Sequence, residues 1–115
     1  MSVGRKGFLA GGNFITDYVK VLDAWPEQDT LASIRSELMS NGGGPYNILK
    51  DLVVLAPDLP LEACGLVGKD ANGDWVTADC RASGIDGTQL HRTGMAATSY
   101  TDAMTVASSG RRTFF

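Results

Sequence analysis

Residues 41–47 read Asn-Gly-Gly-Gly-Pro-Tyr-Asn, and the apolar-rich segment 48–55, Ile-Leu-Lys-Asp-Leu-Val-Val-Leu, follows them directly. Glycine lacks a Cβ, so this turn lets the backbone approach a ligand closely. Pro45 suits the first position of a helix, where its missing N–H is not needed. Apolar residues then recur at helical spacing and predict one apolar face: Ile48, Leu49, Leu52 and Leu55. The segment therefore predicts a glycine turn that opens directly into a helix.

This turn has two interpretations on the residues alone. The first N–H groups of a helix have no partner within the helix and can bind polar or anionic atoms. Asn47 adds a side-chain amide that both donates and accepts hydrogen bonds. A ligand-binding turn fits these features, and so does a flexible loop that precedes an ordinary core helix.

The composition is typical of one soluble globular domain. The chain has 115 residues, of which 43% are hydrophobic and 20% charged. No apolar run approaches the roughly 20 residues that span a bilayer, and the N-terminal apolar stretch is too short for a secretion signal. The net charge is −3 and the basic residues are scattered, whereas a nucleic-acid surface needs a basic stripe. We expect neither a membrane nor a nucleic-acid partner.

The cysteines and the histidine form no metal or redox motif. Cys64 and Cys80 make no CxxC pair, and without a secretion signal they predict reduced thiols in the cytoplasm. His91 is the one histidine of the sequence, so a zinc site is not expected. We assign all three side chains to structural roles.

Residues 68–74 superficially resemble a calcium-binding loop. The glycine of that loop is misplaced, and Arg81 stands where a bidentate glutamate is required. The alternative is a turn in which Asp70 or Asn72 caps a helix. That helix is expected to reach about Ser83 and to end at Gly84.

Strands are predicted in the remaining segments. Residues 8–10 and 61–67 read as short buried strands, residues 18–25 as a strand closed by Pro26, and residues 90–92 as a weak strand. Residues 95–107 and 111–115 predict a β-hairpin, and an end in mid-strand looks like a truncation.

Two features remain ambiguous on the residues alone. In residues 30–39 a helical stripe of apolar residues competes with strand-like alternation, and helix is favoured. Asp17 follows the first strand, and acids beyond the carboxyl end of a central strand often contact ligands in α/β folds. A solvated turn acid or a helix cap is the favoured interpretation of Asp17.

Four motifs, in order, resemble the amino-terminal third of the ribokinase-like, PfkB-type carbohydrate kinases. Gly12-Asn13 with Asp17 is like the family's opening strand and its substrate-binding acid. Residues 42–47 are like its signature of two glycines, a variable pair or so, and Asn. Residues 65–73 are like its Gly-x-x-Gly-x-Asp-x-x-Gly, and residues 98–115 are like its lid hairpin.

The resemblance implies an α/β fold, namely a partial ribokinase-like three-layer core with a small β lid. The whole chain, residues 1–115, would be the amino-terminal part of such a kinase domain, with lid strands at about 18–40 and 96–115. Residues 30–39 then become a strand. The resemblance also implies four sugar-binding residues: Asp17, Gly43, Gly44 and Asn47. Gly44-Pro45-Tyr46 departs from the residues that the family often has in mid-turn.

The activity implied is that of an ATP-dependent carbohydrate kinase. The family's catalytic base lies in a Gly-Ala-Gly-Asp stretch near its far end, where ATP and Mg²⁺ are also bound; this sequence has neither that stretch nor a Walker-type Gly-Lys-Ser/Thr. We therefore expect no catalytic, ATP-binding or metal residue in this chain, and no activity from it alone. The alternatives are a non-catalytic sugar-binding module, a homodimerisation module that pairs through lid strands, and the product of an interrupted gene, for which we expect self-association.

Overall fold

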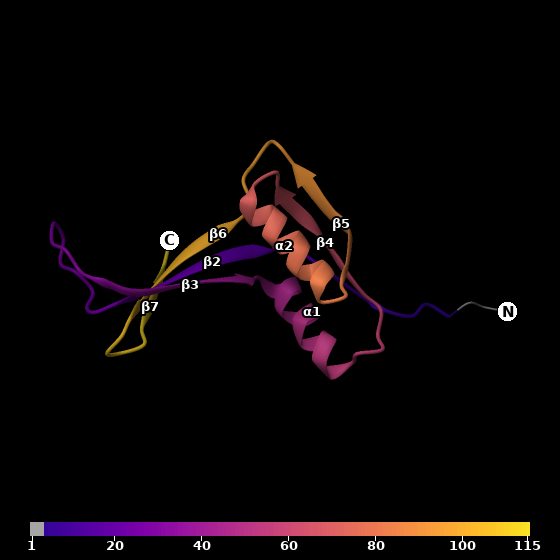
Figure 1. Cartoon of the computed structure of the whole chain (residues 1–115), viewed down its shortest axis with the longest axis horizontal. Helices are drawn as coiled ribbons and strands as arrows, with labels where there is room; N and C mark the ends of the chain where they lie inside the picture. The colour runs from indigo at the N-terminus through magenta and orange to yellow at the C-terminus, as the bar shows by residue number, and fades with distance from the viewer. Residues whose placement is uncertain (1–3) are drawn as a thin grey trace. The chain divides into compact units, whose positions relative to one another are not determined.

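The computed structural model describes residues 4–115. Within this range helices and strands follow one another as Figure 1 traces: β1 (Phe8–Gly11), β2 (Ile15–Leu22), β3 (Ile34–Gly42), α1 (Gly44–Leu55), β4 (Leu61–Gly68), α2 (Ala71–Ala82), β5 (Asp86–Thr93), β6 (Tyr100–Val106) and β7 (Arg112–Phe114). The chain divides into two compact units. Among the described residues, unit 1 comprises residues 4–15 and Asn41–Ser99, and unit 2 comprises Thr16–Ser40 and Tyr100–Phe115. No described helix is long and apolar enough to cross a membrane.

Unit 1 contains a parallel sheet of three strands in the order β1-β4-β5. Alternate residues of β4, among them Ala63 and Val67, are fully or almost fully buried, as period-two alternation requires when one face is covered. Both helices contact this sheet, α1 against β1 and β4 and α2 against β4 and β5. On the alternate positions Leu9 and Leu66 remain exposed, at 58% and 60%. The buried-strand prediction therefore holds for β4, whereas β1 buries only Ala10.

Helix α1 begins in the glycine turn, as predicted, with Pro45 in its first turn. The predicted apolar face is partly wrong. Leu49 is fully buried and Leu52 packs against the core, but Ile48 and Leu55 are 48% and 78% exposed. The residues that pack against the core instead include Tyr46 and Val53, both partly buried, because only the side of the helix that is turned toward the sheet is covered.

Helix α2 confirms the prediction of a capped helix. Asp70 is its N-cap and accepts a hydrogen bond from the Gly73 amide over 2.8 Å. The helix ends at Ala82, and Gly84 follows with φ of +76°, the left-handed conformation that ends many helices. On its inner face Val76 and Cys80 are fully buried.

Unit 2 is a mixed sheet of four strands in the order β3-β2-β6-β7. Strands β2 and β6 are parallel, and β6 and β7 form the predicted antiparallel hairpin. β2 ends at Leu22, before Pro26, and β6 begins at Tyr100, later than predicted. The strand implied for residues 30–39 begins only at Ile34, and residues 30–33 lie outside it. The helix that the periodicity of this segment favoured is wrong, because pairing in the sheet overrides a weak helical stripe.

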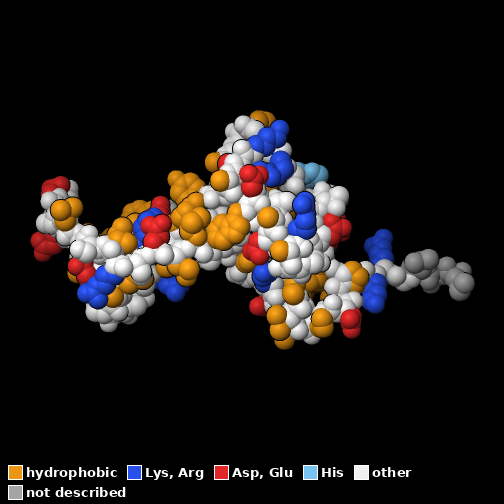
Figure 2. Space-filling view, in the orientation of Figure 1, with side chains coloured by type: hydrophobic (Ala, Val, Ile, Leu, Met, Phe, Trp, Pro, Cys, Tyr) orange, Lys and Arg blue, Asp and Glu red, His pale blue; other side chains and the backbone are white. Residues whose placement is uncertain are grey.

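Aromatic contacts and an ion pair stabilise unit 2. Tyr18 meets Tyr100 edge to face, with ring centroids 6.0 Å apart. Trp25 stacks on Phe115 with ring centroids 6.4 Å apart. Lys20 pairs with Asp102 across the β2–β6 ladder, and this hydrogen bond raises the pKa of Lys20. Apolar side chains also gather on the visible surface over β2 and β6 (Figure 2). The α/β prediction is thus confirmed as a parallel sheet with helices and a separate mixed sheet.

Candidate functional site

The glycine turn of residues 41–47 lies against the residues that follow β1. A Cβ built on Gly43 would lie 2.1 Å from the Asn13 carbonyl oxygen, and one built on Gly12 would lie 3.5 Å from the Pro45 ring. Because β1 ends at Gly11, the turn sits at the carboxyl edge of the parallel sheet. This edge is where open α/β sheets bind their ligands.

Gly43 sets the conformation of this turn. It is the N-cap of α1 and has φ of +98°, which side-chain-bearing residues rarely adopt. Its carbonyl oxygen accepts a hydrogen bond from the Asn47 amide over 3.0 Å and closes the first turn of the helix. No side chain caps this helix start. Gly44 and Asn47 are exposed, and a Cβ on Gly44 would meet no atom within 4 Å.

The carboxylate of Asp79, in the last turn of α2, holds both sides of the turn. Its Oδ2 accepts from Tyr46 Oη over 2.5 Å and from Asn41 Nδ2 over 3.1 Å. Its Oδ1 accepts from Lys50 Nζ over 3.2 Å, and Lys50 also donates to Ser83 Oγ over 2.6 Å. One carboxylate therefore links α2 to residues on each side of the three glycines.

These contacts shift two pKa values in opposite directions. Burial, the largest influence on Asp79, would raise its pKa, but the hydrogen bonds from Tyr46, Asn41 and Lys50 together hold it below its ordinary value. Burial raises the pKa of Tyr46, and its hydrogen bond to Asp79 adds to that shift. At neutral pH the pair is a phenol that donates to a carboxylate.

A second carboxylate, Asp70, holds the segment before β6. Its Oδ2 accepts from the Thr98 amide over 2.8 Å and its Oδ1 from Thr98 Oγ1 over 2.7 Å. Thr98 Oγ1 in turn accepts from the Gly68 amide over 2.8 Å. The hydrogen bonds from Thr98 and from the Gly73 amide lower the pKa of Asp70.

The structure places the four predicted sugar-binding residues in two groups. Gly43, Gly44 and Asn47 come together in the turn of unit 1, while Asp17 lies half-buried inside β2 in unit 2, where it pairs with Thr101. The interpretation of Asp17 as a turn acid or a helix cap is therefore wrong. Sequence reasoning missed Asp79, because its partners lie 29 to 38 residues away and no local pattern connects them.

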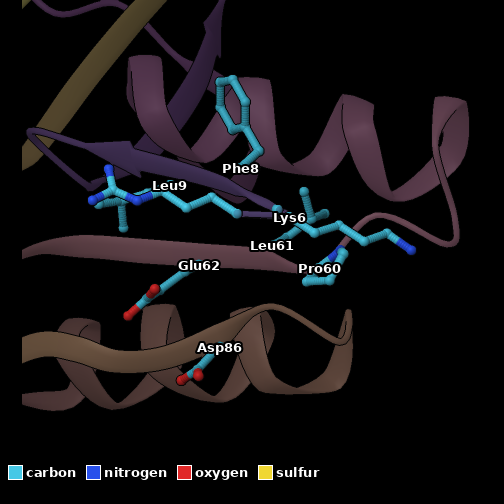
Figure 3. Close-up of a pocket in the computed structure, with 9 residues that line it drawn as sticks. Lys6, Phe8, Leu9, Pro60, Leu61, Glu62 and Asp86 are labelled. Atoms are coloured by element: carbon cyan, nitrogen blue, oxygen red, sulfur yellow. The ribbon is translucent and has the colours of Figure 1, made fainter. Parts of the chain in front are cut away.

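A hollow of about 320 Å³ lies elsewhere in unit 1, and Figure 3 shows its lining. It is formed where β1, β4 and β5 begin, around Phe8, Leu61 and Asp86. This is the amino edge of the parallel sheet, opposite the edge where α/β sheets bind ligands. Its acidic side chains, Glu62 and Asp86, come from paired positions of β4 and β5. We therefore place the candidate site at the glycine turn.

Comparison with known proteins identifies relatives of this fold. No family model matches the chain. It is 35% identical over 94 residues to the ATP-dependent ribose-1-phosphate kinase of Halopiger xanaduensis, and the match covers 80% of this chain and 31% of that protein. The chain thus spans about a third of the length of this curated relative.

Solved structures of kinases match a larger part of the chain than the curated relative does. A nucleoside kinase of Methanocaldococcus jannaschii, an archaeal member of the ribokinase family, matches with a TM-score of 0.84 at 19% identity, over 96% of this chain and 36% of its own. The ribokinase of Arabidopsis thaliana, solved with ribose and ATP, matches with a TM-score of 0.81 at 18% identity, over 96% and 35%. The chain therefore has part of the ribokinase-like fold, as its motifs indicated.

Proposed function

We propose that this chain is the sugar-binding portion of an ATP-dependent carbohydrate kinase, which transfers a phosphoryl group to a sugar hydroxyl. The observation that carries the proposal is the glycine turn, held against the residues after β1 at the carboxyl edge of the parallel sheet. The likeness in fold to ribokinase-family structures over 96% of the chain supports it. The match to a ribose-1-phosphate kinase makes ribose and its phosphate the first substrates to test.

The proposed roles of the four residues follow from their chemistry. A carboxylate such as Asp17 can accept hydrogen bonds from two vicinal hydroxyls. The side-chain amide of Asn47 can both donate and accept hydrogen bonds. Gly43 and Gly44 let the backbone lie against the sugar ring. The exposure of Gly44 and Asn47, and the empty space at the Cβ position of Gly44, support these roles.

The transfer of the phosphoryl group needs parts that this sequence lacks. Phosphoryl transfer depends on positioning the nucleophile and on cations and donors that stabilise the transferring group. The sequence contains neither a Gly-Ala-Gly-Asp stretch nor a Walker-type lysine motif. We propose that the chain by itself binds neither ATP nor Mg²⁺, and that strands 18–40 and 96–115 act as a lid over the sugar in the whole kinase. Its free thiols, Cys64 and Cys80, fit a cytoplasmic protein.

Calorimetric titration of the chain with D-ribose and with ribose 1-phosphate tests this function. We expect one of the two sugars to bind, and Asp17→Ala to weaken that binding at least about tenfold, the equivalent of about 1.4 kcal/mol. Asp51→Ala is the matched control, since it removes the same charge from an exposed position of α1. Equal affinity of the wild type and Asp17→Ala would remove Asp17 from the site, and no binding of either sugar would refute the proposal.

A non-catalytic dimerisation module is the second candidate, and unit 2 supports it. Strands β3 and β7 are the edges of its sheet, and unpaired edges recruit partners. Large apolar side chains are exposed on these edges, among them Leu38 at 65% and Phe114 at 61%. Sedimentation velocity distinguishes the candidates. A dimer that Leu38→Lys or Phe114→Lys converts to monomer, in a chain that binds no sugar, would favour the module.

A further inference from the structure

Asp79 lies in α2, outside the proposed sugar site, but it contacts residues on both sides of the three glycines. Asn41 precedes the three glycines and Tyr46 directly precedes Asn47, and both donate to the same oxygen, Oδ2 of Asp79. Asn41 is almost fully buried, and the Asp79 side chain is 22% exposed. Water is therefore a poor substitute for either donor, and one carboxylate oxygen holds a side chain on each side of the turn.

The turn also needs such a constraint. Gly43 is fixed at φ of +98°, and no side chain caps the start of the helix. Ordering this glycine backbone in one conformation costs conformational entropy, and no capping hydrogen bond offsets that cost. Within the turn, the backbone N–H of Asn47 donates a hydrogen bond to the Gly43 carbonyl oxygen, and this bond helps to hold Asn47 in place. The Asp79 bonds fix the flanking residues, and hydrogen bonds to a charged acceptor are stronger than neutral ones.

Lys50 is the third partner of Asp79, and it contacts a different carboxylate oxygen from the other two. It contacts Oδ1, the other oxygen, and Ser83 Oγ, and its Nζ lies 5.7 Å from the centroid of the Tyr46 ring. It stands one helical turn beyond Tyr46 and is about a third exposed. Removal of its charge therefore leaves both hydrogen bonds to the flanks of the glycine turn in place.

We propose that Asp79 is a positioning residue for the sugar site: it holds the turn of residues 41–47 in the geometry that binds the sugar, without contact to the sugar itself. This inference rests on the proposed function. It assigns to the last turn of α2 a part in substrate affinity that goes beyond the four residues named by the resemblance. Because both donors on the turn use Oδ2 and Lys50 uses Oδ1, an asparagine can turn its one oxygen toward Tyr46 and Asn41 and keep both bonds, whereas an alanine removes the acceptor of both.

The test measures affinity and amide hydrogen exchange on the same variants: Asp79→Ala, Tyr46→Phe and Lys50→Met. With whichever of D-ribose or ribose 1-phosphate the wild type binds, we expect Asp79→Ala and Tyr46→Phe to weaken affinity about tenfold or more. The exchange rate of the Asn47 amide should rise by a similar factor in both variants. Lys50→Met should keep both quantities within about twofold of the wild type, because it leaves the two bonds to the turn intact.

Each contrary result identifies what fails. Unchanged affinity in folded Asp79→Ala and Tyr46→Phe, beside normal binding by the wild type, overturns the positioning role alone. An equal loss of affinity in Lys50→Met shows a general structural effect and also overturns it. If Asp79→Ala does not fold, the comparison of Tyr46→Phe with Lys50→Met decides. Absence of binding by the wild type refutes the proposed function and the positioning role together.

Discussion

Tyr46 donates its phenolic hydrogen to Asp79 Oδ2 over 2.5 Å, and this hydrogen bond joins the first turn of α1 to the last turn of α2. The two residues are 33 positions apart in the sequence. Their contact holds the helix that begins in the glycine turn to the helix that follows the other glycine motif, and so connects two of the sequence motifs within unit 1.

Tyr46→Phe should lower the free energy of unfolding by about 1–2 kcal/mol, because it removes a hydrogen bond to a charged, largely buried acceptor. Urea denaturation of both proteins measures the difference. Tyr100→Phe is the control: the residue is 57% exposed, and we expect a change within about 0.5 kcal/mol. Equal stability of Tyr46→Phe and the wild type would mean that the bond contributes nothing.

The stability of the chain should fall in acid. The folded pKa of Asp79 lies below its unfolded value of about 3.9, so its charged form stabilises the folded state above that pH. This contribution is lost as the pH falls toward and through the folded pKa. Urea midpoints measured from pH 6 to pH 2 should show a smaller decrease for Asp79→Asn than for the wild type. Parallel curves for the two proteins would contradict the role of the Asp79 charge.

Two adjacent glycines should respond to alanine in opposite ways. Gly43→Ala places a Cβ 2.1 Å from the Asn13 carbonyl oxygen at φ of +98°, and we expect a loss of about 2–4 kcal/mol. Gly44→Ala meets no atom within 4 Å in the first turn of a helix, and we expect no loss or a gain of up to about 1 kcal/mol. Thermal unfolding of the two variants compares them. Similar stabilities would show that the turn is not constrained as described.

The two cysteines should differ in reactivity. Cys80 is fully buried, and burial, together with the nearby Asp79 charge, raises its pKa to about 11. At pH 8 little thiolate is present at Cys80, whereas Cys64 is partly exposed. Alkylation with iodoacetamide followed by mass spectrometry should label Cys64 first and Cys80 only after unfolding. Equal labelling rates in the folded protein would mean that Cys80 is accessible.

The order of the helices and strands could be predicted from the sequence because the residues that begin and cap the helices act locally. Pro45 after three glycines starts a helix, and Asp70 before Gly73 caps one, through contacts within a few residues. The strand at 34–42 could not be predicted from its own residues. Its conformation is decided by pairing with β2, while its apolar residues fit both periods.

The candidate site was predictable only in part, for a similar reason. Gly43 and Asn47 stand in one short motif, so their proximity follows from the sequence. The network around Asp79 depends on the packing of α2 against α1, and a single aspartate in a helix gives no sign of such partners. Likewise, the exposure of Ile48 and Leu55 follows from how α1 lies on the sheet and not from its apolar pattern.

The sugar site at the glycine turn is tested most directly by NMR. The isotope-labelled chain is titrated with D-ribose and with ribose 1-phosphate, and the chemical shifts of its backbone amides are recorded. We expect one sugar to shift the backbone amide signals of Asp17, Gly43, Gly44 and Asn47, and the signals of residues around the hollow at Phe8 and Leu61 to stay unchanged. Shifts confined to that hollow, or no shifts at millimolar sugar, would contradict a sugar site at the glycine turn.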